Sequence, residues 1–475
     1  MTEKIERRDY GLYFMGQNIV YLFIMNYIQN YFTDVVGIAA GTVAIILLVA
    51  RFWDAVNDPI FGVIVDRSRL KSGRYKPWLK LSTYILPFFT IAIFCAPVAW
   101  PQDVKTVFCG LLYIVWGMAY TICDVPIYSL SVAMTNDIQE RTALIARGRL
   151  HSVMGIFIVM TLTVPLTNIL GGLFGSAVPA WLLAAILFSA LGFILMRPIH
   201  KSAQERFIDQ ESDPITLGAI LQYSRSNKYL LIFFGAVIVA SLTNTTTILP
   251  LYFASVNLGD SNMYVPVVVV TMIGSPLVSI FMPKLTKRFD KFQIYMTGLF
   301  TTIVTSVAAY FIGYEGWRFV PFLIVSAVKG LGFSCSTVMS YMFTADCIEY
   351  GTYVSGKRAE GVTFSIQTFT TKMTGAISGF VAMGLLGWLF GYRSAYYVDN
   401  TLVMPEQPLS AMRGIWFMYS LFPAFGACAA FLILIFLYKL RDKDVQVMAD
   451  VNSGRINREQ GAKLLGGKYE PVEKV

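Results

Sequence analysis

Charged side chains are scarce in this chain of 475 residues. Asp, Glu, Lys and Arg together make up 14% of it, against about a quarter in ordinary soluble domains. Hydrophobic residues make up 56%, and the mean hydropathy is +0.59. Such a chain has too few polar side chains to cover a folded surface in water, so the composition excludes a soluble globular protein. It predicts a membrane protein that crosses the bilayer several times.

Histidine and cysteine are also scarce. The chain has two histidines, His151 and His200, and six cysteines without the spacing of metal ligands. A histidine-rich metal site is therefore excluded, and the cysteines are expected to be small buried apolar residues. A cleavable signal peptide is not expected either, because the first apolar stretch follows a charged segment, Glu3 to Asp9. No bound cofactor is predicted.

Twelve stretches have the length and apolar character of membrane helices, about 20 residues each. We expect them near residues 10–32, 39–65, 78–98, 105–130, 149–170, 178–196, 229–255, 263–283, 292–313, 319–345, 363–390 and 413–438. The longest polar interruption, 198–228, separates two groups of six. The predicted organisation is an N-terminal six-helix bundle at 1–197, a cytoplasmic linker at 198–228, a C-terminal six-helix bundle at 229–438 and a cytoplasmic tail at 439–475. Two such bundles around a central site form the general design of alternating-access carriers.

The distribution of Lys and Arg predicts how the chain sits in the membrane. If the N-terminus is cytoplasmic, 31 of the 38 basic residues fall on the cytoplasmic side, 4 fall outside and 3 lie within spans. This is the positive-inside pattern. It predicts a multi-pass protein of the cell membrane with both termini in the cytoplasm. The net charge of +9 then reflects orientation in a lipid bilayer and needs no nucleic-acid partner.

The second span carries one cation and two carboxylates. Each such charge costs roughly 2.5 to 3.5 kcal/mol at the centre of a bilayer, so Arg51, Asp54 and Asp58 must face protein or water. Asp54, Asn57 and Asp58 are three or four residues apart, which places their oxygen atoms on one helix face. Converging oxygen ligands suit a hard cation such as Na⁺. The alternative is a set of polar contacts between helices without a cation.

The fourth span carries a carboxylate among aromatic rings. Trp116, Tyr120, Asp124 and Tyr128 recur every four residues and form a stripe along one side of the helix. Aromatic rings offer apolar faces to a sugar, and Asp124 can accept two hydrogen bonds from its hydroxyls. The stripe therefore predicts a sugar site, with ordinary helix packing as the alternative for each ring. Thr121, on the same helix, is expected to add its oxygen to the cation site.

Basic residues in the spans are candidates for substrate binding or coupling. Arg149 opens the fifth span and either binds sugar hydroxyls or a carboxylate, or reaches for the membrane edge. Lys372, one turn after Thr368 in the eleventh span, is expected to neutralise the carboxylates of the second span when no cation is bound. Lys329, near the middle of the tenth span, either binds an anionic substrate group or forms a structural ion pair with an acid such as Asp34.

The loop after the second span, 62–77, combines an acid with several bases. It resembles the loop motif of the major facilitator superfamily, and a shorter version, 283–291, follows the eighth span. In that superfamily the acid and bases can form a gate that breaks and reforms. The resemblance therefore predicts gating roles for Asp66, Arg67 and Arg74. The alternative is that the bases serve only to orient the chain.

Several longer motifs resemble one family, the melibiose permease-like glycoside-pentoside-hexuronide:cation symporters of the major facilitator superfamily. The resemblance runs over nearly the whole chain and is carried by residues 31–37, 50–59, 120–130, 345–351 and 367–368. It implies an all-α membrane protein of twelve transmembrane helices in two six-helix bundles. It also implies a cation site at Asp54, Asn57, Asp58 and Thr121. The positions that the resemblance ties to sugar binding or coupling are Tyr120, Asp124, Arg149, Gln367, Thr368 and Lys372.

Four positions depart from the family pattern. Asn18 stands where a sugar-binding aspartate is found, Gln17 stands at a lysine position, and Tyr128 and Thr337 stand at tryptophan positions. Loss of an acid near the sugar, in a chain with several buried bases, fits an anionic sugar such as a glucuronide. It equally fits a neutral glycoside or pentoside that the Asn18 amide would hold. The identity of the sugar therefore stays open.

The predicted function is a secondary active symporter that imports a sugar, glycoside or uronide with Na⁺ or H⁺ by alternating access. Its partners are the small-molecule substrate, the coupling cation and the lipid bilayer. One alternative keeps the fold and changes the cargo to a lysolipid, since cation-coupled lysolipid carriers also resemble this family. Another is an intramembrane enzyme that uses the paired carboxylates as acid and base. The sequence offers it no nucleophile or metal motif, so an enzyme is not expected.

Overall fold

The computed structural model describes residues 2–68, 73–96, 98–135, 138–206, 227–356, 360–398 and 401–469. The first half of the chain forms long helices joined by short loops. They are α1 (Lys4–Asn30) with the π-helical turn η1 (Tyr31–Val35), α2 (Ala40–Arg67), α3 (Lys76–Phe94), α4 (Gln102–Met134), α5 (Ile138–Phe174), α6 (Ala177–Met196) and the short α7 (Ile199–Ser202).

The second half is built in the same way but has more breaks. Its elements are α9 (Lys228–Ser241), α10 (Pro250–Tyr252), η2 (Phe253–Asn257), η3 (Ser261–Met263), α11 (Tyr264–Met272), α12 (Gly274–Arg288), α13 (Lys291–Ile312), η4 (Gly316–Arg318), α14 (Phe319–Ser355), α15 (Glu360–Gly384), η5 (Leu385–Leu389), β1 (Tyr396–Val398), β2 (Thr401–Val403), α16 (Leu409–Ser420), α17 (Phe422–Leu437), α18 (Asp442–Asn452) and α19 (Arg458–Leu464). β1 and β2 pair as an antiparallel hairpin.

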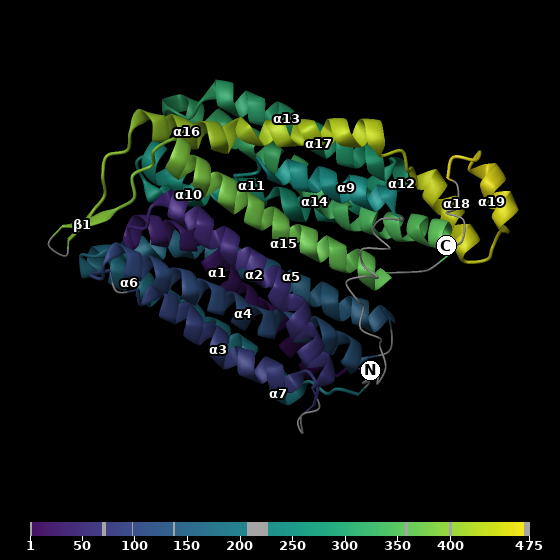
Figure 1. Ribbon diagram of the computed structural model, residues 1–475, viewed down its shortest axis with the longest axis horizontal. Helices are drawn as coiled ribbons and strands as arrows, with labels where there is room; N and C mark the ends of the chain where they lie inside the picture. The colour runs from purple at the N-terminus through teal and green to yellow at the C-terminus, as the bar shows by residue number, and fades with distance from the viewer. Residues whose placement is uncertain are drawn as a thin grey trace.

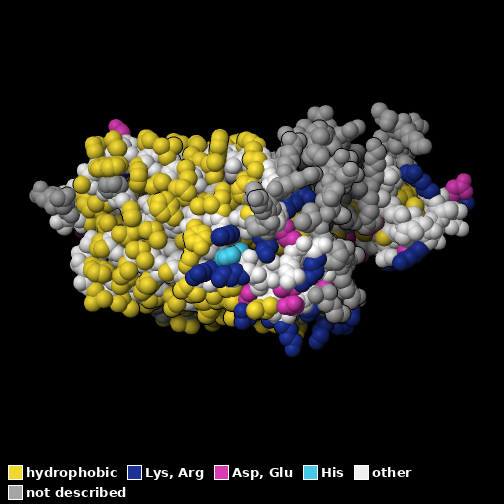
Figure 2. All heavy atoms as spheres, turned by 90° about the horizontal axis from the view of Figure 1, so that it is seen from below, with side chains coloured by type: hydrophobic (Ala, Val, Ile, Leu, Met, Phe, Trp, Pro, Cys, Tyr) yellow, Lys and Arg dark blue, Asp and Glu magenta, His cyan; other side chains and the backbone are white. Residues whose placement is uncertain are grey.

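The helices run side by side along the long axis of the molecule (Figure 1). The early helices, in purple and blue, form one layer, and the later helices, in teal to yellow, form the other. Both termini lie at one end, which we call the terminal end, and the β1–β2 hairpin lies at the opposite end, the hairpin end. Hydrophobic side chains cover the body of the molecule, whereas Lys, Arg, Asp and Glu gather toward the terminal end (Figure 2). This is an all-α membrane protein with an apolar belt and a charged end.

Ten helical segments within the described residues are long and apolar enough to cross a membrane, and they match ten of the twelve predicted spans. The first and seventh predicted spans are the others. α1 is long enough, but charged residues in its first turns and several amides make it more polar. The prediction of one continuous seventh helix at 229–255 is wrong, because α9 ends at Ser241. In the segment that follows, 243–247, threonines and an asparagine favour local side-chain hydrogen bonds over a helix.

The broken segment after α9 is covered by the last two long helices. Thr243 Oγ1 accepts the N–H of Gly426 on α17 at 2.9 Å, and Thr245 Oγ1 donates to the carbonyl of Met418 on α16 at 2.5 Å. Non-helical backbone at membrane depth is tolerated where protein satisfies its polar groups. The packing of α16 and α17 therefore permits the break.

The two halves are joined by hydrogen bonds at the hairpin end. Asn168 near the end of α5 donates to Ser261 Oγ and to Asn262 Oδ1, each at 2.9 Å. Thr33 Oγ1 and the Tyr252 hydroxyl lie 2.8 Å apart and share a hydrogen bond. These contacts bring η1 and α5 of the first half against α10 and η3 of the second.

The C-terminal tail folds against the terminal end of the second half. Asn452 of α18 donates to Glu349 Oε2 at 2.8 Å, and Arg458 of α19 donates to the carbonyl of Tyr353 at 3.0 Å, both on α14. Val445 and Met448 of α18 join the hydrophobic core of this half. The tail is thus part of the second bundle. The division of the chain at 198–228 stays a prediction, because residues 207–226 lie outside the description.

Candidate functional site

Asp54 lies on α2 in contact with a guanidinium from its own helix. Arg51 Nη1 is 3.0 Å from Asp54 Oδ2, one turn away, and Arg51 also contacts the sulfur of Met25 on α1. Asp54 is 9% exposed, and its second oxygen, Oδ1, is buried without a hydrogen-bond partner among the described residues. One carboxylate oxygen is therefore neutralised by Arg51, and the other is available to a cation.

Gly117 of α4 makes room for this carboxylate. A Cβ atom on Gly117 would lie 2.6 Å from Asp54 Oδ1, closer than real contacts allow. Only a glycine lets α4 approach Asp54 so closely without moving it. The free oxygen of Asp54 thus faces the backbone of α4, one turn before Thr121.

Asp58 is bound by both halves of the molecule. Its Oδ2 forms an ion pair with Lys372 of α15, and its Oδ1 accepts a hydrogen bond from Thr121 Oγ1 at 2.7 Å. Asn57 Nδ2 donates to the same threonine oxygen at 3.1 Å. The four predicted cation ligands therefore lie in one region between α2 and α4. No cluster of three or more His, Cys, Asp or Glu suited to a metal occurs among the described residues. The candidate cation site has two carboxylates, an amide and a hydroxyl.

One oxygen of Asp124 accepts hydrogen bonds from two neighbouring polar groups. Gln17 Nε2 on α1 donates to Asp124 Oδ1 at 2.7 Å, and the Tyr120 hydroxyl donates to the same oxygen at 3.3 Å. Gln17 Oε1 is buried and has no partner among the described residues. The carboxylate predicted to bind sugar hydroxyls is thus held by an amide and a phenol, with an unpaired acceptor beside it.

The aromatic stripe of α4 continues onto α1. The rings of Tyr21 and Tyr120 stack at 4.3 Å between centroids, and those of Trp116 and Tyr120 stack at 5.9 Å. Trp116 is only 1% exposed, and its Nε1 donates to Thr90 Oγ1 at 2.9 Å. In this conformation Trp116 supports Tyr120 from behind and has no open face for a substrate.

Two further predicted substrate residues contact their own half of the molecule. Asn18 Nδ2 donates to the carbonyl of Phe14 at 2.8 Å and to Ser152 Oγ on α5 at 3.0 Å. The ring of Tyr128 meets that of Phe14 edge-on at 5.2 Å. The Asn18 amide therefore binds α1 to α5, and it would need to turn to reach a sugar.

Arg149 and the α15 residues approach from the two sides of the molecule. Arg149, an exposed residue of α5, lies over the ring of Tyr341 on α14 at 5.8 Å. Gln367 is buried, with Oε1 unpaired among the described residues, whereas Thr368 is exposed. Gln367, Thr368 and Lys372 of α15 are thus the polar groups that the second half contributes, and Lys372 meets Asp58 of α2.

Lys329 of α14 is not paired with Asp34. Its Nζ donates to the carbonyl oxygen of Tyr419 at 3.1 Å and lies 3.5 Å from that of Ser420, and it is 8% exposed. Asp34 instead accepts a hydrogen bond from the Tyr392 hydroxyl. The last carbonyls of a helix lack donors of their own, so Lys329 caps α16 where it breaks before α17.

The predicted gate residues fall at the terminal end. Asp66 and Arg67 belong to α2, but their side chains lie outside the description. The backbone N–H groups of Arg74, Tyr75 and Lys76 donate to Glu205 at 2.6 to 2.9 Å. Glu205 of the linker therefore caps the start of α3, as a carboxylate at a helix N-terminus does. The gating role of the three predicted residues stays a prediction.

The sequence prediction placed Asn18 of α1 at the substrate site but missed the contacts of three other α1 residues. Gln17, Tyr21 and Met25 recur every four residues and contact Asp124, Tyr120 and Arg51 respectively. That spacing is visible in the sequence and marks one face of α1, which meets the polar faces of α2 and α4. Gly117 was missed because the need for a glycine arises only when another helix is known to approach it.

The architecture defines the class of this protein. Long apolar helices form two layers, and ion pairs and unpaired polar atoms from both layers meet between them, which is the arrangement of a membrane transporter. The chain belongs to the MFS/sugar transport protein family, whose model matches residues 10–442. It is a member of the major facilitator superfamily and a transporter, not an enzyme.

Its curated relatives cover the chain almost from end to end. It is 28% identical to an uncharacterized symporter, YjmB, of Bacillus subtilis, over 94% of this chain and 95% of the relative. It is 27% identical to a glucuronide carrier protein homolog of Escherichia coli, over 91% and 92%. It is 25% identical to an isoprimeverose transporter of Lactiplantibacillus pentosus, over 94% and 91%.

A solved structure supports the fold. The nucleoside transporter NupG superposes with a TM-score of 0.61 over 92% of this chain and 100% of NupG, at 13% identity. At that identity the likeness shows a shared major facilitator architecture and nothing about the cargo.

Proposed function

We propose that this protein is a symporter that carries a sugar, glycoside or uronide together with Na⁺. The observation that carries this proposal is the ion pair between Asp58 and Lys372, which joins a candidate cation site in the first half to a helix of the second. A cation bound at Asp54, Asn57, Asp58 and Thr121 would have to displace Lys372. Binding of the cation would then break this ion pair between the two halves.

This exchange gives a physical basis for coupling. An unpaired carboxylate inside a membrane is costly, so Asp58 needs either Lys372 or a cation at every stage. When Na⁺ takes that place, Lys372 is released toward the neighbouring α15 side chains, Thr368 and Gln367. The proposed substrate site, between these side chains and Asp124, is then changed by the cation. Each ligand thereby alters the affinity for the other.

The proposed cargo is a pyranoside that spans the two halves. Asp124 and Gln17 Oε1 supply acceptors for hydroxyl groups, Tyr120 supplies a ring face, and Arg149 supplies a donor. Among the relatives, the glucuronide carrier homolog is named for an anionic sugar and the isoprimeverose transporter for a neutral one. The basic Arg149 favours a substrate with an acid group, and a neutral glycoside is the other outcome of the test below.

We further propose that the terminal end faces the cytoplasm. The charged side chains seen at that end in Figure 2 support this orientation through the positive-inside rule. The hydrogen bonds that join the halves at the hairpin end support a state closed toward the outside. In this state substrate would be released inward.

Uptake into proteoliposomes tests the function. A panel of labelled neutral glycosides and uronides is offered with an inward Na⁺ gradient, with a pH gradient, or with neither. We expect at least one sugar to accumulate with the Na⁺ gradient. Accumulation that follows pH and ignores Na⁺ would assign the coupling ion to H⁺, and no accumulation under either gradient would contradict sugar symport.

Two variants locate the sites. Asp58→Asn should abolish stimulation by Na⁺, whereas Val56→Ala, an exposed position on the same helix, should leave it unchanged. Asp124→Ala should weaken sugar binding by about one to three orders of magnitude, because a charged acceptor of two hydrogen bonds is lost. Normal Na⁺ stimulation in folded Asp58→Asn protein would place the cation elsewhere.

A further inference from the structure

The carbonyl groups at the end of α1 and η1 are capped from both halves of the molecule. The carbonyls of Val36 and Gly37 accept hydrogen bonds from Lys105 Nζ at 2.8 Å and Gln102 Nε2 at 2.9 Å, both on α4. The carbonyls of Thr33 and Val35 accept from the N–H of Ala395 at 3.0 Å and the Tyr397 hydroxyl at 2.7 Å, both in the second half. The last carbonyls of a helix need such outside donors, and here two of the four donors belong to the other half.

The donors of the second half lie within the described residues 392–398 and 401–407, which we call the strap. The Gln407 side chain closes its base, since Oε1 accepts from the N–H of Arg393 at 2.9 Å and Nε2 donates to the carbonyl of Arg393 at 2.7 Å. Above the base, β1 pairs with β2 in the hairpin. Figure 1 shows this hairpin running from the second half to the end of the first. Residues 399 and 400 at its tip lie outside the description.

The strap fits closely against the start of the loop after η1. Gly37 has a φ of +82°, which favours glycine, and a Cβ atom there would lie 2.5 Å from the carbonyl oxygen of Ala395. Close to it, the Tyr392 hydroxyl donates to Asp34 Oδ1 at 2.8 Å, and the Tyr392 ring meets that of Tyr252 edge-on. A hydrogen bond to a carboxylate is among the stronger kinds. The strap thus makes three hydrogen bonds with the end of η1.

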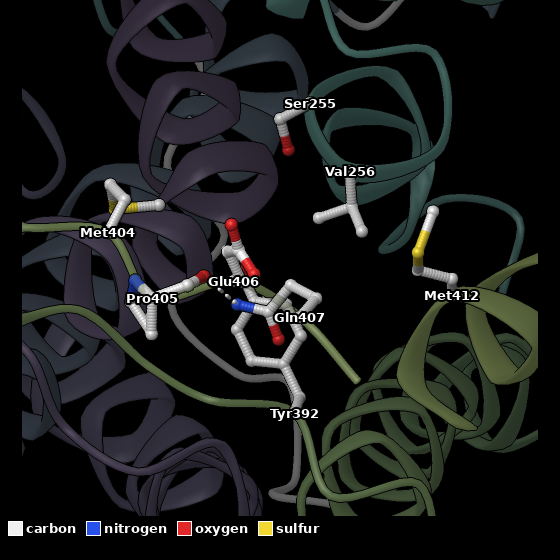
Figure 3. Close-up of a pocket in the computed structure, with 8 residues that line it drawn as sticks. All are labelled: Ser255, Val256, Tyr392, Met404, Pro405, Glu406, Gln407 and Met412. Carbon is white, nitrogen blue, oxygen red and sulfur yellow. Dashed lines mark hydrogen bonds between the residues drawn. The ribbon is translucent and has the colours of Figure 1, made fainter. Parts of the chain in front are cut away.

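Solvent has access to the base of the strap. A pocket of about 410 Å³ lies there, and Tyr392, Glu406 and Gln407 line it together with Ser255 of η2 (Figure 3). One water molecule takes about 30 Å³ in the liquid, so the pocket has room for several. Water in this pocket can reach Tyr392 as its hydrogen bond to Asp34 breaks, and a second pocket of about 480 Å³ adjoins Tyr397 and Gly37. A contact of this kind opens at modest cost, unlike one sealed in an apolar core.

We propose that the strap is a latch that holds the hairpin end closed and must detach from η1 before that end can open to receive substrate. The inference rests on the alternating-access function proposed above. It adds that the strap sets the balance between the states closed and open at the hairpin end. The strap does so through its hydrogen bonds to η1, which follows α1. Weakening the latch then favours the state open at the hairpin end without altering the cation or sugar ligands.

Distance measurements between spin labels test the latch. Labels are placed at Val104 of α4 and Leu409 of α16, exposed positions near the hairpin end on the two halves, in protein whose native cysteines are replaced. The test variant is Tyr392→Phe with Tyr397→Phe, which removes two hydroxyl donors and keeps the rings. The control is Tyr396→Phe on the same strand as Tyr397, at a position where the ring is exposed.

We expect one short distance in the parent and the control, and an added longer distance in the test variant. The ratio of long to short should rise about fourfold to a hundredfold, because two hydrogen bonds are lost and each shifts an equilibrium by a factor of about two to ten. Gln407→Ala, which loosens the base but keeps both hydroxyls, should shift the ratio in the same direction. Unchanged distances in both folded variants would overturn the latch. Since no substrate is present, this result is independent of whether the uptake assay finds a sugar.

Discussion

At the scale of single residues, two lysines inside the membrane have different roles. Lys372 pairs with Asp58 across the two halves, and Lys329 caps the carbonyls of α16 within the second half. From the sequence, both lysines were candidates for substrate binding or coupling. A buried lysine needs a partner for its charge, and a substrate group or a carboxylate of the protein can each provide it. The structure identifies the partner of each lysine, and the partner shows which role the lysine has.

For Lys372 we predict that Lys372→Met separates cation binding from transport. Methionine keeps the length and removes the charge, so Na⁺ no longer competes with an ammonium for Asp58. The apparent affinity for Na⁺ should rise by about tenfold or more, as measured by calorimetry. Net sugar uptake should be lost, because the empty carrier would hold an unpaired carboxylate, while exchange with Na⁺ on both sides continues. Weaker Na⁺ binding in the folded variant would mean that Lys372 does not occupy the cation site.

For Lys329 we predict a structural effect without a change in selectivity. Lys329→Gln keeps a donor for the carbonyl of Tyr419 but removes the charge. The melting temperature should fall, and the ratio of uronide to neutral glycoside in a competition assay should stay within about twofold of the parent, since a binding difference under about 0.4 kcal/mol is expected. A clear shift of that ratio would show that Lys329 acts on the substrate.

At the scale of elements, the sequence predicted the helices and the polar faces of α2 and α4 but not how they meet. Spacing along one helix fixes which residues share a face, so Asp54, Asn57 and Asp58 were found together. Contacts between helices depend on packing, and spacing alone could not show that Gln17 of α1 binds Asp124 or that Trp116 is covered. The charge of Lys372 inside the eleventh span predicted a partner among the carboxylates of the second span, and the structure pairs it with Asp58. The break after Ser241 was missed because its flanks are apolar.

The contact between α4 and α2 gives a prediction for one glycine. In Gly117→Ala, the new methyl group meets Asp54 Oδ1 and forces the carboxylate or the helix to move. We expect the apparent affinity for Na⁺ to fall by about tenfold or more, since overpacking a close contact typically costs about 1 to 3 kcal/mol. The matched control is Gly172→Ala on α5, where no atom lies within 4 Å of an added Cβ. Equal Na⁺ affinity in both variants would place the cation away from Asp54.

At the scale of the whole molecule, the ligand sites of the two halves form one thermodynamic system. If Na⁺ and sugar both act on the contact between α2 and α15, saturating Na⁺ should raise the affinity for sugar, and saturating sugar should raise that for Na⁺ by the same factor. We expect a factor of about 5 to 150, the usual range of such couplings. Calorimetric titrations in both orders measure it. A cation effect on sugar without the reverse effect would show that the two do not bind the same molecule at once.

The pairing of Asp54 with Arg51 and of Asp58 with Lys372 also has an electrical consequence. In the empty carrier these four charges cancel, so its return across the membrane moves no net charge through this site. The carrier loaded with Na⁺ and a neutral sugar has one extra positive charge there. A membrane potential of 100 mV contributes about 2.3 kcal/mol per charge, so a cell that is negative inside would drive the loaded step inward and leave the empty step indifferent to voltage.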